Sequence, residues 1–129
     1  MATDKTLKGG QMQYRITNAR TGQVVAGRAE LAQSPLKRMK GLLGKKGLAP
    51  DEAIILRPAS SIHTVFMRFA IDVIYVDRDN KVVKVVRDLV PYRFSSAKGA
   101  KTVIEMMTGA TNATDLQPGD QLVMTEHAA

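Results

Sequence analysis

The sequence predicts a small, mainly β domain, a compact β-sandwich or small barrel of about eight short strands with one to two short helices. Three observations lead to this fold class. Apolar residues alternate with polar ones or form short runs rich in valine and isoleucine, turn residues separate these runs at short intervals, and one segment alone has helical spacing. With 129 residues, of which 44% are hydrophobic and 24% charged, the chain is long enough for one globular core.

We expect a single domain over residues 12–125. Residues 1–11 are mostly small and polar, so we expect disorder there, and residues 126–129 should form a flexible tail. No apolar run reaches the ~18 residues of a membrane span, and no apolar leader opens the chain. These features predict a cytoplasmic protein, or an exported one if a leader has been removed. The absence of cysteine excludes disulfides and thiolate chemistry.

The first strands should form a hairpin. Residues 12–17 alternate between apolar and polar side chains, which is typical of a half-buried strand. Residues 18–22 supply a turn, in which Gly22 can adopt a positive φ, and residues 23–31 return as the second arm.

A helix should follow this hairpin. Ser34 is suited to the N-cap and Pro35 to the first helical position. Leu36, Met39 and Leu43 then form one apolar stripe.

The densest apolar run of the chain spans residues 61–77 and should form two consecutive strands at the centre of a sheet. A short buried strand over residues 53–56 precedes it. Residues 77–81 then make a tight reversal, in which Asn80 is suited to the left-handed conformation. This reversal leads into a partner strand, so residues 71–88 should form a hairpin.

Beyond this hairpin, residues 90–96 lack any period and carry two aromatic residues and an arginine. They are expected to form an ordered loop at the lip of a pocket. Residues 102–108 predict another strand, with a helix as the alternative, and Gly109 ends it. The rest of the domain should be a helical turn, a reversal and a closing strand (residues 111–116, 117–120 and 121–125).

Polar side chains interrupt the central apolar run and mark a candidate site. Because an unpaired buried charge is very costly, such groups must find partners. We expect a polar cleft around His63 and Asp72, roofed by residues 91–94, whose arginine and aromatics suit a carbohydrate, a peptide or a small anionic ligand. The candidate ligand-binding residues are His63, Thr64, Met67, Arg68, Asp72, Tyr92, Arg93 and Glu105.

Three other interpretations of the same residues remain open. Ser61, His63 and Asp72 could form a hydrolytic triad. His63, Asp72 and Glu105 could hold zinc or manganese. Alternatively the polar groups are structural, with Asp72 bonded to backbone N–H groups or to a cation such as Arg68, Arg93 or His63, and Glu105 paired with Arg38 or another cation.

The net charge of +7 favours acidic partners. A cluster of cations without any acid lies on or just beyond the predicted helix. No aromatic residue interleaves these cations as a base-stacking platform would require, so the cluster is interpreted as a solvated helix face or a weak nucleic-acid contact. The cluster comprises Lys37, Arg38, Lys40, Lys45 and Lys46.

Several stretches together resemble the family known as domain of unknown function 192. The matching stretches are residues 38–44, 62–73, 77–83 and 103–105, Pro91, Gly109, and residues 118–120. Order and spacing agree over about residues 12–125. The resemblance implies a compact β-sandwich or barrel with short helices, and it carries no established activity. Ala59 stands where many members have cysteine.

We therefore expect a non-enzymatic binding or accessory module, without metal or cofactor, that is a monomer or weak dimer and binds an unknown small molecule or peptide. The alternative is a hydrolase or metal-dependent enzyme that uses His63 and Asp72. A third is weak nucleic-acid binding through residues 37–46.

Overall fold

The structure, a computed structural model, describes residues 13–32, 47–65 and 67–127. Seven strands form one mixed sheet: β1 (Gln13–Asn18), β2 (Val24–Leu31), β3 (Glu52–Leu56), β5 (Ile71–Val76), β6 (Val82–Leu89), β8 (Thr102–Met107) and β9 (Leu122–His127). Their order is β6-β5-β8-β3-β2-β1-β9, and only the β2–β3 pair is parallel. A second sheet pairs β4 (Ser61–His63) with β7 (Phe94–Ser96). The mainly β prediction is confirmed.

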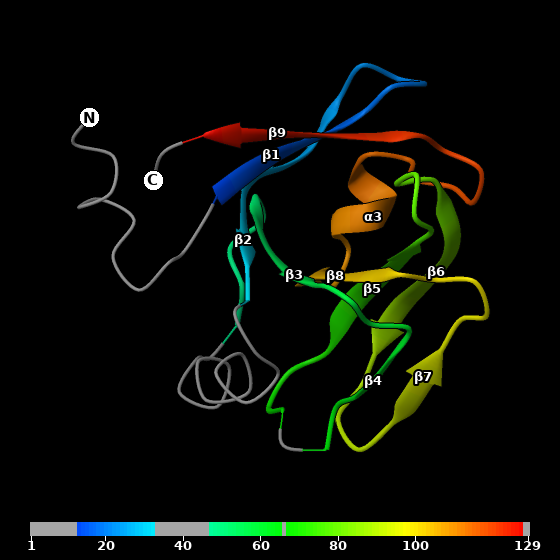
Figure 1. Cartoon of the computed structure of the whole chain (residues 1–129). Helices are drawn as coiled ribbons and strands as arrows, with labels where there is room; N and C mark the ends of the chain where they lie inside the picture. The colour runs from blue at the N-terminus through cyan, green and yellow to red at the C-terminus, as the bar shows by residue number, and fades with distance from the viewer. Residues whose placement is uncertain (1–12, 33–46, 66, 128–129) are drawn as a thin grey trace.

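Strand β5 is buried along its whole length because it lies between β6 and β8 and has both faces covered. Ile74 and Val76 belong to one apolar cluster, which the curved large sheet encloses together with α3 (Ala110–Ala113). Val73 and Tyr75 belong to a second cluster on the opposite face. Figure 1 shows α3 on one side of β5 and β8 and the β4–β7 sheet on the other.

The two edge strands of the large sheet approach one another at their first residues. Lys81 and Gln121 form an isolated bridge, the Val82 N–H donates to the Asp120 carbonyl at 2.8 Å, and the Leu122 N–H donates to the Asn80 carbonyl at 3.0 Å. Beyond this corner, β6 and β9 do not pair within the described residues. The large sheet is therefore strongly rolled but is not a closed barrel.

Two predicted turns are confirmed by their backbone geometry. Gly22 has φ 75° between β1 and β2, and Asn80 has φ 64° between β5 and β6. The Asp77 carboxylate accepts hydrogen bonds from the N–H groups of Asp79 and Lys81, at 2.9 and 3.0 Å. This side chain thus organises the second turn.

Three expectations are wrong in part. The run at residues 61–77 does contain two strands, but β4 pairs with β7 in the small sheet and is not at the centre of the large one. Residues 94–96, expected in a loop, form β7, because they find a partner in β4. Strand β9 continues to His127, since β1 pairs with it along that length. The predicted helix and the basic cluster at residues 37–46 lie outside the described residues, as do residues 1–12.

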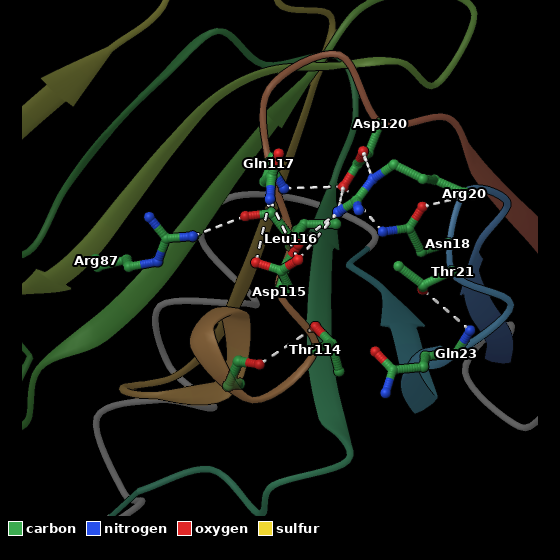
Figure 2. A network of polar contacts seen from close by, with 11 residues as sticks. Asn18, Arg20, Thr21, Gln23, Arg87, Thr114, Asp115, Leu116, Gln117 and Asp120 are labelled. Carbon is green, nitrogen blue, oxygen red and sulfur yellow. Dashed lines mark hydrogen bonds and ion pairs between the residues drawn. The ribbon is translucent and has the colours of Figure 1, made fainter.

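A polar network joins the β1–β2 turn to the turn before β9 (Figure 2). Asp120, whose side chain is 4% exposed, accepts from Arg20 Nε at 2.7 Å, from Asn18 Nδ2 at 2.9 Å and from the Gln117 N–H at 2.9 Å. Mainly because of the hydrogen bond from Arg20, the pKa of Asp120 falls from 3.8 to about 2, although burial opposes this shift. The ionised carboxylate therefore stabilises the contact between the two turns.

This lowered pKa predicts a loss of stability in acid. The contribution is complete above the unfolded pKa of 3.8 and is lost as the pH falls through about 2, because the folded protein then has to protonate Asp120. Since Arg20 is partly exposed, we expect a loss of about 1–2 kcal/mol in the free energy of unfolding, measured in urea. The Asp120→Asn variant should be less stable at neutral pH and should change less over this interval. An equal acid response in both proteins would contradict the assignment.

Candidate functional site

The candidate residues fall into three groups in the structure. His63, Arg68, Tyr92 and Arg93 are exposed on or beside the small sheet. Thr64 and Met67 are buried directly after β4. Asp72 and Glu105 are fully buried within the large sheet, so the eight residues do not form one cleft.

Asp72 is bonded on both carboxylate oxygens to groups of its own fold. One oxygen accepts from the Asp88 N–H at 2.9 Å, and the other from the N–H and the hydroxyl of Thr111 at 3.0 and 2.6 Å. Backbone N–H groups are thus its partners, as one interpretation of the sequence expected. The carboxylate ties the end of β6 and the start of α3 to β5.

Replacing Asp72 with asparagine should destabilise the protein, because the amide NH₂ would face N–H donors. The cost should be about 2–4 kcal/mol in the free energy of unfolding, the range for a buried hydrogen-bonded charge. Thr111→Ser keeps the hydroxyl and is the matched control, whereas Thr111→Val removes one bond alone. A change of less than ~1 kcal/mol in Asp72→Asn would show that these bonds are not important for stability.

Glu105 lies on the other face of the sheet from Asp72. In the antiparallel β5–β8 pair Asp72 is opposite Met106 and Glu105 is opposite Val73, and residues directly opposite share a face. A metal site that combines both acids is therefore not assembled. Among the described residues, no group of three histidine, aspartate or glutamate side chains is placed to hold a metal ion.

The hydrolytic triad is not assembled either. Ser61 and His63 alternate with the buried Ile62 and point outward from β4. Asp72 points into the apolar cluster on the α3 side of the large sheet, where Thr111 and Asp88 bind it. His63 and Asp72 therefore act in different parts of the fold.

Thr64 fixes the loop that precedes β7. Its hydroxyl donates to the Val90 carbonyl at 2.7 Å and accepts from the Arg93 N–H at 2.9 Å. Its backbone N–H donates to the Arg93 carbonyl at 2.8 Å, and its carbonyl accepts from the Tyr92 N–H at 3.0 Å. One fully buried residue thus holds the loop at three positions.

The fixed loop displays two aromatic side chains. Tyr92 is 72% exposed and Phe94 is 71% exposed. Tyr92 also has φ 64°, a left-handed conformation that is costly for a bulky residue and that is found preferentially at functional sites. Phe94 is directly opposite His63 in the β4–β7 pair, and Ser96 is opposite Ser61.

We call this surface the β4–β7 face and define it by five exposed side chains: Ser61, His63, Tyr92, Phe94 and Ser96. The sequence placed Phe94 in the roof of a cleft but not among the binding residues. The signal that could have found it is the aromatic–arginine–aromatic order at residues 92–94.

A separate, largely apolar groove of about 500 Å³ lies between β2, the residues before β3, and α3. Its lining includes Val25, Met107 and Ala110, and also Asp51. Asp51 forms an ion pair with Arg28 at 3.0 Å, and the hydrogen bond from Arg28 lowers the pKa of Asp51. Among the residues that the structure describes, none of the sequence-predicted site residues lines this groove.

The hydroxyl of Thr64 should prove necessary for the order of the loop. Thr64→Val keeps the shape of the side chain but leaves the Val90 carbonyl and the Arg93 N–H without this partner. We expect a loss of about 1–3 kcal/mol in the free energy of unfolding and faster amide exchange at residues 92 and 93. Thr64→Ser retains the hydroxyl and should resemble the wild type in both measurements. Unchanged exchange in Thr64→Val would contradict this role.

The molecule belongs to the class of small, mainly β domains. Its large sheet is rolled, and a two-stranded sheet packs on the outer side of that sheet. Within that class, the chain is a member of the DUF192 family, an uncharacterized ACR family whose model matches residues 16–124. A UPF0127 protein of Thermococcus sibiricus is 34% identical over 83% of this chain and 72% of its own length. A UPF0127 protein of Pyrococcus furiosus is 32% identical over 83% of this chain and 95% of its own length.

Two crystal structures have a similar fold. A candidate transcription regulator from Sinorhizobium meliloti matches with a TM-score of 0.75 and 20% identity, over 88% of this chain and 93% of that protein. A protein of unknown function from Novosphingobium aromaticivorans matches with a TM-score of 0.68 and 24% identity, over 86% and 83%. At these identities the likeness establishes the fold alone. In the part of the chain that the structure describes, no helix is long and apolar enough to cross a membrane.

Proposed function

We propose that this protein is a non-enzymatic binding module and that the β4–β7 face is its ligand-binding surface. The observation that carries the proposal is the display of Tyr92 and Phe94, each more than 70% exposed, on a loop that Thr64 holds by backbone and side-chain hydrogen bonds. Large exposed aromatic side chains are enriched at binding surfaces and contribute much of the binding energy there.

The order of the loop supports this proposal energetically. Binding normally costs the entropy of fixing loops and side chains. Here the backbone at residues 90–93 is already fixed by Thr64, and the strand that follows is paired with β4. A ligand that covers Tyr92 and Phe94 therefore gains apolar contact without having to order the chain that carries them.

The environment of Asp72 supports a binding role over catalysis. Both of its oxygens are engaged by Asp88 and Thr111, so it is not available to orient His63 as a general base. His63 instead lies opposite Phe94 on an exposed strand, where an imidazole is placed to contact a ligand.

The apolar groove beside α3 is a second candidate site. Its volume of about 500 Å³ lies within the range of small-molecule pockets, and its lining is mostly apolar. It would suit a small hydrophobic compound. The β4–β7 face is preferred because it combines aromatic, imidazole and hydroxyl groups.

Amide chemical shifts would test the proposal directly. The protein is titrated with a panel of oligosaccharides, acidic peptides, oligonucleotides and a fatty acid. We expect at least one of the polar ligands to shift amides at residues 61–65 and 92–96, and Phe94→Ala should weaken that binding about tenfold, in line with the loss of an aromatic contact of ~1–2 kcal/mol. Val123→Ala, which shortens an exposed side chain on β9, is the matched control and should bind normally.

Two outcomes would contradict the proposal. Shifts confined to residues 24–27 and 107–114 would assign binding to the apolar groove instead. Normal binding by Phe94→Ala would show that the exposed ring is not part of the site.

A further inference from the structure

We infer that the ligand of the β4–β7 face is a single-stranded nucleic acid, bound by base stacking on Tyr92 and Phe94 and by the exposed cations of the chain segments that form this face. The inference rests on the proposed function and names its ligand class. Charge and ring placement support it independently of each other.

The two chain segments that form the β4–β7 face carry only positive charges. Residues 57–70 and 90–101, which the β4–β7 pairing brings together, contain none of the 12 acidic residues of the chain and five of its 19 lysines and arginines. All five cations are exposed, so they are accessible to phosphates: Arg57, Arg68, Arg93, Lys98 and Lys101. A surface with this one-sided charge attracts a polyanion.

The aromatic residues distinguish a nucleic acid from other polyanions. Tyr92 and Phe94 flank Arg93 and keep more than 70% of their surfaces exposed. Small sheets that bind single strands stack bases on such rings, and stacking tolerates any base because every base has a π-face. In a duplex the bases stack on one another and are not available to these rings, so a single strand is the better fit.

The remaining groups of the face suit the sugar–phosphate backbone. Ser61 and Ser96 are opposite one another in the β4–β7 pair, and both are exposed. Hydroxyl groups of this kind commonly contact phosphate or sugar oxygens. His63, opposite Phe94, adds an imidazole next to a stacking position. Aromatic and polar groups thus lie on the same side of the small sheet.

The β4–β7 face differs from the basic cluster at residues 37–46 because it combines cations with aromatic residues. That cluster has cations but no interleaved aromatic residue, whereas residues 92–94 alternate aromatic, arginine and aromatic. Charge alone gives weak binding that depends on salt, and stacking adds affinity that salt affects less. The two sites therefore differ in how their binding responds to mutation.

Fluorescence anisotropy of a labelled oligo-dT of about eight nucleotides would test the inference, since single small β modules occupy ~4–16 nucleotides. The full chain is titrated at several salt concentrations and compared with a duplex of equal length. We expect tighter binding of the single strand. Phe94→Ala and Tyr92→Asn should each weaken it about tenfold, as expected for loss of one stacked base. Asparagine is used at position 92 because it tolerates the left-handed conformation.

Matched controls separate stacking from charge. Val123→Ala should bind as the wild type does. Arg93→Ala should reduce the slope of log affinity against log salt by about 0.7, the value for one phosphate contact to a single strand. Arg15→Ala removes an exposed arginine from β1 and should leave the slope nearly unchanged. Melting temperatures should stay near the wild-type value in these variants, since every substituted side chain is exposed.

Several results would overturn the inference: no binding of oligo-dT at low salt, tighter binding of the duplex, or equal affinity in the wild type and both aromatic variants. Loss of binding in Lys45→Ala/Lys46→Ala, with normal binding in both aromatic variants, would assign the nucleic acid to the basic cluster instead. If an oligosaccharide or peptide shifts amides of the β4–β7 face and oligo-dT does not, the inference fails while the proposed function stands. If no compound shifts that face, both fail.

Discussion

The burial of both faces of β5 and β8 is the constraint on which the rest of the structure depends. Strands with apolar side chains on both faces need cover on both sides. On one side the large sheet curls, with α3 beside its apolar interior. On the other side the β4–β7 sheet supplies Ile62 to the second cluster, and the Tyr75 hydroxyl bonds to Ser95 at 2.8 Å. The small sheet is thus a covering layer, which leaves its outer face available for display.

Buried carboxylates in this fold serve as connectors between segments that are distant in the sequence. Asp72 joins β5 to the N–H groups of Asp88 and Thr111, and Asp120 joins its own turn to Arg20 and Asn18. Removing such a group leaves donors without partners, which costs more than the bond itself contributes. This reasoning explains why an aspartate within an apolar strand need not indicate catalysis, even when a histidine lies a short distance before it in the sequence.

In the proposed binding surface, unlike at these buried carboxylates, the groups proposed to act are exposed. Buried Thr64 holds the loop in place, and the loop exposes the rings of Tyr92 and Phe94. The backbone strain of Tyr92 and the exposure of both rings are tolerated because the stability of the domain comes from its two apolar clusters. A stable core and a strained, exposed loop are the division expected of a small binding domain.

The sequence by itself determined the mainly β class, the family, most strand positions, and the turns at Gly22 and Asn80, because alternation and turn residues act over a few neighbouring positions. It also indicated that His63, Asp72 and Glu105 need partners. Tertiary structure alone decided which partners they face. Strand β4 pairs with β7 in a separate sheet, and the β5–β8 register places Asp72 and Glu105 on opposite faces of the large sheet. The physical reason is that strand pairing and register depend on segments far apart in the chain, so local periodicity cannot specify them.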